Sequence, residues 1–117
     1  MYLEEIRTYC LQKKAVEETF PFDQSTLVFK VMGKMFALCD VDNFTSLNLK
    51  CLPDRAIDLR ESYHGIIPGY HMSKVHWNTV SVNSDVPNAL ILELIDHSYD
   101  LVVASLPKKI QHELAHR

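Results

Sequence analysis

The sequence predicts an α+β domain in which an antiparallel sheet of about five strands carries helices on one of its faces. Three observations lead to this prediction. Helical spacing and two-residue spacing of apolar side chains occur in different segments, a glycine turn joins two strand-like runs, and no segment repeats. Because the chain has 117 residues, of which 47% are hydrophobic and only three are glycine, we expect residues 1–117 to form one globular domain.

Residues 2–14 predict a first helix, because apolar side chains recur there at steps of three and four. Residues 17–23 then form a polar passage without regular spacing. We expect Phe20 and Phe22 in this passage to anchor the loop on the core, and we favour this interpretation over ligand binding.

The clearest local signal is a hairpin formed by residues 26–32 and 35–40. The predicted turn is Gly33-Lys34, in which Gly33 supplies the positive φ angle that a two-residue hairpin turn requires. Residues 44–50 alternate polar and apolar side chains, which predicts a third strand with one buried face. A meander of three strands follows from these runs.

The second half of the chain begins with a short helix from Pro53 to about Tyr63, since proline suits the first helical turn. The Pro68-Gly69 pair marks a bend, and the aromatic and β-branched residues of segment 70–82 predict one or two further strands.

Two helices are expected to close the chain. Residues 84–87 resemble a helix start with a capping side chain and a proline, and helical spacing continues to Val102. A last short helix covers residues 108–116 after Pro107. The predicted order is therefore helix, three strands, helix, one or two strands, and two helices.

The cysteines and the apolar runs of the sequence indicate where the protein is located and whether it associates with a membrane. Cys10, Cys39 and Cys51 form an odd set without Cys-x-x-Cys spacing, which indicates buried, reduced thiols and a cytoplasmic protein. We see neither a leader pattern nor an apolar run of membrane-spanning length, so we expect no membrane association.

The formal net charge of −3 has the wrong sign for a protein that coats nucleic acid, but the charge is unevenly distributed. Residues 1–26 and residues 79–117 each hold three basic and five acidic side chains, whereas residues 27–78 hold six basic and five acidic ones. The middle of the chain is therefore the basic part.

No constellation of residues indicates catalysis, and we predict neither enzymatic activity nor a cofactor. Nucleophile elbows, phosphate-cradling glycine loops and zinc-binding helices are all absent from the sequence. His71 and His76 are the nearest approach to a metal motif, but a separation of five places them on opposite faces of a strand. We therefore predict no metal site.

The basic residues are better placed for function. Lys34 lies in the predicted turn and Lys30 on its approach, where both could reach a phosphate backbone; the simpler interpretation of Lys34 is a solvated turn residue. On the later predicted strand, Lys74 and His76 share one face, while Trp77 lies on the other and more often belongs to a core than to a base-stacking platform.

Lys108 and Lys109 follow Pro107 at the predicted start of the last helix. Cations oppose the helix dipole at this end unless an anion is bound nearby. The placement indicates an anion site, and the equally open alternative is a marginal helix whose lysines are simply exposed.

Four segments together carry a family resemblance. They are Gly33–Ala37, Asn48–Cys51, Ile67–Val80 with its Pro-Gly-Tyr-His-Met-x-Lys-x-His-Trp block, and Asp96–Val102. On these segments the chain resembles the MmcQ/YjbR family over almost its whole length. The resemblance implies a CyaY-like fold, similar in outline to the frataxin-like domains, and DNA binding through two protruding wings, one of which would carry Lys30 and Lys34.

The resulting hypothesis is a monomeric, non-enzymatic DNA-binding protein. It contacts phosphates without sequence specificity, because no helix-turn-helix, zinc finger or basic helix is recognisable. The candidate contact residues, with His76 assisting when protonated, are Lys30, Lys34, Lys50, Lys74, His76, Lys108 and Lys109.

Two alternatives remain open. The first is an interaction module that binds a protein partner or an anionic metabolite at Lys108-Lys109 or in the Tyr70–Trp77 region. The second is iron handling by analogy with frataxin-like folds, which ranks last because Glu4, Glu5, Glu17 and Glu18 supply only a sparse acidic ridge.

Overall fold

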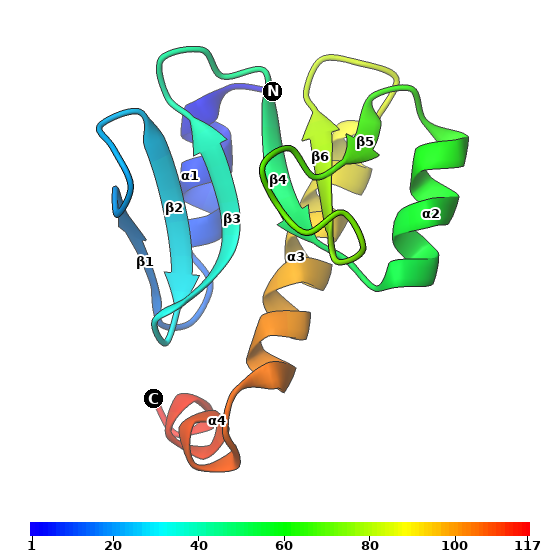
Figure 1. Ribbon diagram of the computed structural model, residues 1–117. Coiled ribbons are helices and arrows are strands. Elements are labelled where there is room, and N and C mark those ends of the chain that lie inside the picture. The colour runs from blue at the N-terminus through cyan, green and yellow to red at the C-terminus, as the bar shows by residue number, and fades with distance from the viewer.

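The computed structural model describes residues 1–117 and confirms the α+β class (Figure 1). The elements are α1 (Leu3–Leu11), β1 (Val16–Thr19), β2 (Thr26–Val31), β3 (Lys34–Asp40), β4 (Ser46–Lys50), α2 (Pro53–Ser62), β5 (Ile66–Pro68), β6 (Trp77–Ser81), α3 (Asn88–Ser105) and α4 (Lys108–Ala115). All strands are antiparallel in a six-stranded sheet of order β1-β2-β3-β4-β6-β5. No helix has the length and apolar character needed to cross a membrane.

Helices α1 and α3 cover one face of the sheet, and α2 lies beside β5 at its edge (Figure 1). The covered face holds a core of 22 buried residues. Phe36 lies at its centre, with its ring 6.5 Å from that of Phe29 and 5.4 Å, edge to face, from that of Tyr99 on α3. Burial on this face supplies the main driving force for folding.

A hydroxyl of α3 enters the sheet where β3 and β4 separate. The β3–β4 pairing runs from Cys39 opposite Leu47 to Ala37 opposite Leu49 and stops there. The fully buried Ser98 Oγ accepts a hydrogen bond from Lys50 N at 2.9 Å and donates one to Phe36 O at 2.6 Å. The hydroxyl thus satisfies two backbone groups that the ladder leaves unpaired, and beyond it the two halves of the sheet diverge.

Two strands were not expected. Residues 17–23 were predicted to be irregular, but residues 17–19 belong to β1, which pairs with β2 as an edge strand. The polar residues of β1 suit such an edge, because Glu18 reaches Arg7 of α1 with Oε1 and Nη2 2.5 Å apart. The second, β5, is an edge strand of only three residues, which is too short to show an alternation of polar and apolar side chains in the sequence.

Other boundaries also differ from expectation. The hairpin turn is Met32-Gly33, both with positive φ, so Lys34 begins β3 instead of completing the turn. Residues 70–76 form a loop, and only Trp77–Ser81 of the predicted strand region is extended. No side chain caps α3, whose flanking residue is Pro87.

Candidate functional site

The sheet face opposite α1 and α3, here called the open face, is covered by a loop instead of helices. Its buried apolar contact is limited to Val28, Leu38 and Trp77, with Met35 and Met72 packed against them. The prediction that Trp77 belongs to a core is therefore confirmed, and the core in question is this small cluster on the open face. The prediction that Phe20 and Phe22 anchor on the core is wrong, since their exposed fractions are 47% and 64%.

The loop of residues 69–76, here called the covering loop, is closed at its neck by a close backbone approach. Gly69 N donates to Trp77 O at 2.8 Å, and Trp77 N donates to Ser73 O at 2.9 Å. A Cβ atom at Gly69 would lie 2.8 Å from Trp77 Cβ, so only glycine fits without displacement. Arg60 of α2 supports the loop by donating to Asn78 Oδ1 at 2.7 Å and to Lys74 O.

Tyr70 is fixed on the open face through its backbone. Its N–H donates to Thr79 Oγ1 at 2.9 Å, and its carbonyl accepts from Asn48 Nδ2 at 3.2 Å. Thr79 Oγ1 in turn donates to Asn48 Oδ1 at 2.5 Å. Since the backbone carries these bonds, the Tyr70 ring is free to project, and 66% of the residue is exposed.

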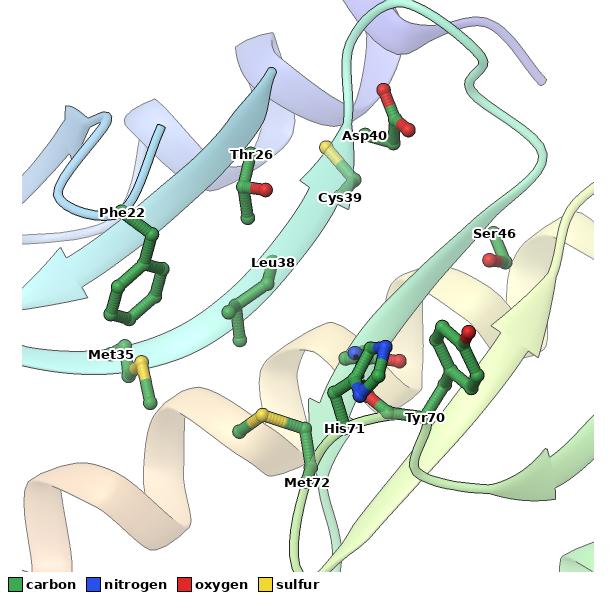
Figure 2. A pocket seen from close by; sticks show the side chains of 11 residues that line it. Phe22, Thr26, Met35, Leu38, Cys39, Asp40, Ser46, Tyr70, His71 and Met72 are labelled. Carbon is green, nitrogen blue, oxygen red and sulfur yellow. Dashed lines mark hydrogen bonds between the residues drawn. The ribbon is translucent and has the colours of Figure 1, made fainter. Parts of the chain in front are cut away.

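A hollow of about 570 Å³, here called the open-face hollow, lies between the covering loop and strands β3 and β4 (Figure 2). Tyr70, His71 and Met72 line it from the loop, while Phe22, Met35 and Leu38 line it from the other side. The remaining lining residues are Thr26, Cys39, Asp40, Ser46 and Asn48. In Figure 2 the methionines lie at one end and Asp40 and Ser46 at the other.

The Tyr70 and His71 rings form an exposed aromatic pair. Their centroids are 4.0 Å apart, with an angle of 53° between the planes. His71 has a φ angle of 59°, a left-handed conformation that non-glycine residues seldom adopt. Such backbone strain is typical of functional positions.

Five of the predicted contact residues lie at one end of the sheet. The end of β2, the start of β3, the end of β4 and the approach to β6 lie at this same end, because neighbouring strands are antiparallel. This end of the sheet is here called the basic end, and it contains Lys30, Lys34, Lys50, Lys74 and His76. Lys108 and Lys109 begin α4, which lies beyond this end of the sheet in Figure 1.

The lysines of this set have no acidic partners, since none of them takes part in the ion pairs of the chain. Lys74 Nζ instead donates to Gly69 O at 3.2 Å. Lys30 has Glu17 as its cross-strand neighbour, which lowers the positive potential at that position. By contrast, Arg7 and Arg55 are paired with Glu18 and Glu93.

Acidic side chains occupy the other end of the sheet. Asp23, Asp40, Asp42 and Asp85 lie in or next to the loops that precede β2, follow β3 and follow β6. These four carboxylates lie away from Lys30, Lys34, Lys50 and Lys74, while Glu17 on β1 and Asp54 in the first turn of α2 lie near the basic end.

The prediction that Lys74 and His76 share the face of a strand is wrong, because both lie in the covering loop. Both residues are nevertheless exposed, as expected. His76 lies beside the end of β4, because Cys51 N donates to His76 O at 2.8 Å. Lys108 and Lys109 are exposed at the start of α4, which packs through its buried Leu114.

Burial raises the pKa of each of the three cysteine thiols in this fold. Cys10, Cys39 and Cys51 are buried and unpaired. Burial raises the pKa of Cys10 and of Cys39 to about 12, so neither thiol is an activated nucleophile. The two guanidinium hydrogen bonds from Arg7 hold the pKa of Glu18 below its usual value. No group of three or more potential metal ligands comes together.

Sequence reasoning missed most of the rim of the open-face hollow. Phe22 and Met35 come from separate segments, and no local spacing relates them to His71 or Met72. The available signal was the aromatic and methionine content of the Tyr70-His71-Met72 stretch, directly after the Pro-Gly bend.

Comparison with known proteins supports the assignment made from the motifs. The YjbR family model matches residues 11–101. The chain is 32% identical over 110 residues to the uncharacterized protein YjbR of Escherichia coli K12, with 93% of each chain covered. It is 36% identical over 109 residues to the uncharacterized protein YbdF of Escherichia coli O157:H7, covering 92% of this chain and 89% of YbdF.

Solved structures give the same result. DR2400 of Deinococcus radiodurans, described as a DUF419 domain, superposes with a TM-score of 0.91 at 40% identity, covering 97% of this chain and 87% of DR2400. A Pseudomonas syringae protein superposes with a TM-score of 0.74 at 28% identity, covering 86% of this chain and 98% of that protein. The chain therefore belongs to the YjbR family.

Proposed function

We propose that this protein binds DNA through phosphate contacts from the basic end, without sequence specificity and without catalysing a reaction. The observation that carries the proposal is that Lys30, Lys34, Lys50 and Lys74 lie at one end of the sheet and that none of them forms an ion pair. Lysines that are not neutralised within the protein are the groups that displace counterions from a phosphate backbone.

The shape of the basic end supports this proposal. Because Ser98 ends the β3–β4 ladder, the β2–β3 hairpin and the β6 side of the sheet separate towards the basic end. We propose that these two parts act as the wings, with Lys34 on one and Lys74 on the other. Two separated groups of cations can contact two positions along one backbone.

The test is binding of a fluorescently labelled DNA duplex over a series of salt concentrations. We expect weak binding that falls steeply with salt, and a double variant, Lys34→Gln with Lys74→Gln, whose affinity is lower for every duplex sequence. Removing two phosphate contacts should reduce the slope of log K against log salt by about two.

A matched control separates local contact from net charge. Gln24→Glu with Asn43→Asp changes the net charge by the same amount, but both residues are exposed in loops at the end of the sheet opposite the basic end. We expect this variant to keep the wild-type salt slope. Equal loss in both double variants, or no binding by the wild type at low salt, would refute the proposal.

A second candidate function is the binding of an anionic metabolite or a protein partner, and the open-face hollow is the observation that favours it. The hollow combines apolar walls with a few polar groups, which is typical of ligand sites. Binding of a small anion that is unaffected by the Lys34 and Lys74 substitutions would favour this candidate.

A further inference from the structure

The basic end and the open-face hollow adjoin one another, and this arrangement determines which nucleic acid fits both. Met35 lines the hollow and is the cross-strand partner of Lys30. Asn48 also lines it, and Lys50 is the next residue of β4 on the same face, roughly 7 Å further along. Met72 lines it as well and precedes Lys74 by two residues in the covering loop.

We infer that the open-face hollow accepts an unstacked base of a single-stranded nucleic acid whose phosphates lie on Lys30, Lys50 and Lys74. This inference rests on the proposed function and narrows its substrate. Flat apolar and aromatic walls beside a row of cations form the arrangement that single-strand binders use, with stacking platforms next to a positive groove.

The walls of the hollow have the chemistry that a base requires. The Tyr70 and His71 rings provide exposed aromatic faces, and Phe22 provides a third aromatic ring across the hollow (Figure 2). Met35 and Met72 add polarisable sulfur atoms at the end of the hollow opposite Asp40 and Ser46. A volume of about 570 Å³ leaves room for a whole nucleoside.

The polar end of the hollow can bind the edge of a base. Asp40 Oδ1 accepts from Asp42 N and Asn43 N, and its Oδ2 atom makes no hydrogen bond within the protein. The Ser46 hydroxyl, also at this end, is not used within the protein either. These groups match the donors and acceptors that a base exposes once it is unpaired.

A stacked duplex cannot satisfy both parts of the site. A base within a duplex has its faces covered by its neighbours and its edge paired, so it would have to be extruded at a cost of a few kcal/mol to enter the hollow. Since a single strand avoids this cost, it should bind more tightly than a duplex of the same sequence.

The experiment compares three labelled DNA probes of equal length at low salt. They are a mixed-sequence single strand, the same strand with abasic sites in its central part, and the corresponding duplex. We expect the single strand to bind about tenfold more tightly than either of the others, which corresponds to stacking of one base. Quenching of the only tryptophan, Trp77, should accompany binding of the base-containing strand, because Met35 and Met72 of the hollow pack against the cluster that contains Trp77.

The variants Tyr70→Ala and Phe22→Ala test the two walls separately. Each should lose about tenfold in affinity for the base-containing strand while binding the abasic strand as the wild type does. Both residues are largely exposed, so the variants should fold normally, and melting temperatures check this. Tyr2→Ala is the matched control, because Tyr2 is 77% exposed at the start of α1, away from the hollow.

The outcomes separate this inference from the proposed function. Equal binding of the three probes, with the loss confined to Lys34→Gln/Lys74→Gln, overturns the inference and leaves the proposed function standing. Absence of binding to every probe at low salt overturns both. Tyr70→Ala could leave the binding of single-stranded DNA intact but abolish self-association measured by sedimentation. In that case the hollow is an interface between two copies of the chain, and the inference fails.

Discussion

On the helix-covered face of the sheet, 22 buried residues form one continuous core, whereas on the open face the buried apolar residues are only Val28, Leu38 and Trp77. Both faces arise from the same alternation along the strands. The difference lies in what covers them: two helices present continuous apolar stripes, while a single loop leaves aromatic side chains exposed at the rim of a hollow. One face is therefore committed to stability, and the other is available for binding.

The largest test of this comparison uses the same substitution on each face. Phe36→Ala removes a fully buried ring and should lower the free energy of unfolding by about 3–5 kcal/mol. Phe22→Ala removes a mostly exposed ring and should change it by less than about 0.5 kcal/mol. Urea denaturation measures both, and similar losses would mean that the open face contributes far more to stability than its burial indicates.

The next test concerns two serine hydroxyls. Ser98→Ala leaves Lys50 N and Phe36 O without the hydroxyl that joins them, so we expect a loss of about 2–3 kcal/mol. Ser46→Ala, beside the open-face hollow, removes a hydroxyl that bonds to no protein group and should be nearly neutral. Hydrogen exchange of the Lys50 amide provides a direct readout; unchanged protection in Ser98→Ala would show that the ladder closes without the hydroxyl.

The helix-covered face was the more predictable of the two. Long helical spacing predicts α1 and α3, and the glycine turn predicts the β2–β3 hairpin, because these signals arise within a few residues of one another. β1 and β5 escaped prediction because edge strands tolerate polar residues and short lengths. Whether Glu17 and Glu18 lie on a strand depends on Arg7 and β2, which local spacing does not reveal.

The candidate site was predictable in its charges but not in its shape. The lysines of the basic end could be chosen from sequence because turns and strand ends are exposed wherever they occur. The open-face hollow depends on the covering loop folding back across β4, which requires the bonds from Asn48 and Thr79 to the backbone of Tyr70. Such long-range side-chain contacts carry no local periodicity.

A third test compares alanine substitutions at two glycines, one on the open face and one in the β2–β3 turn. Gly69→Ala places a methyl group against Trp77 and should cost about 1–2 kcal/mol, because the covering loop must move away from the sheet. Gly33→Ala has open space around it and costs about 1 kcal/mol through its φ angle of 82°. Only Gly69→Ala should shift the fluorescence of Trp77 and weaken the binding of single-stranded DNA. An equal fluorescence shift in Gly33→Ala would contradict the assignment of Trp77 to the open face.

The smallest expected effect is a pH dependence that arises from a buried thiol of the helix-covered face. Burial raises the pKa of the Cys10 thiol from 9.0 to about 12, and the nearby Cys39 adds to the increase. Above about pH 9 the unfolded chain loses a proton that the folded protein retains, so ionisation of this thiol favours unfolding. Its contribution to stability is complete below that pH and declines as the pH rises towards 12, by about 1 kcal/mol at about pH 10.

Denaturation with urea at neutral and alkaline pH measures this decline, and Cys10→Ala should lower the overall stability while reducing the alkaline loss. In the native protein Cys10 should also react slowly with alkylating reagents, since the thiol is both protonated and fully buried. If the alkaline loss is unchanged in Cys10→Ala, the buried thiol is not its source. Groups elsewhere, including those of the open face, would then set the alkaline limit of stability.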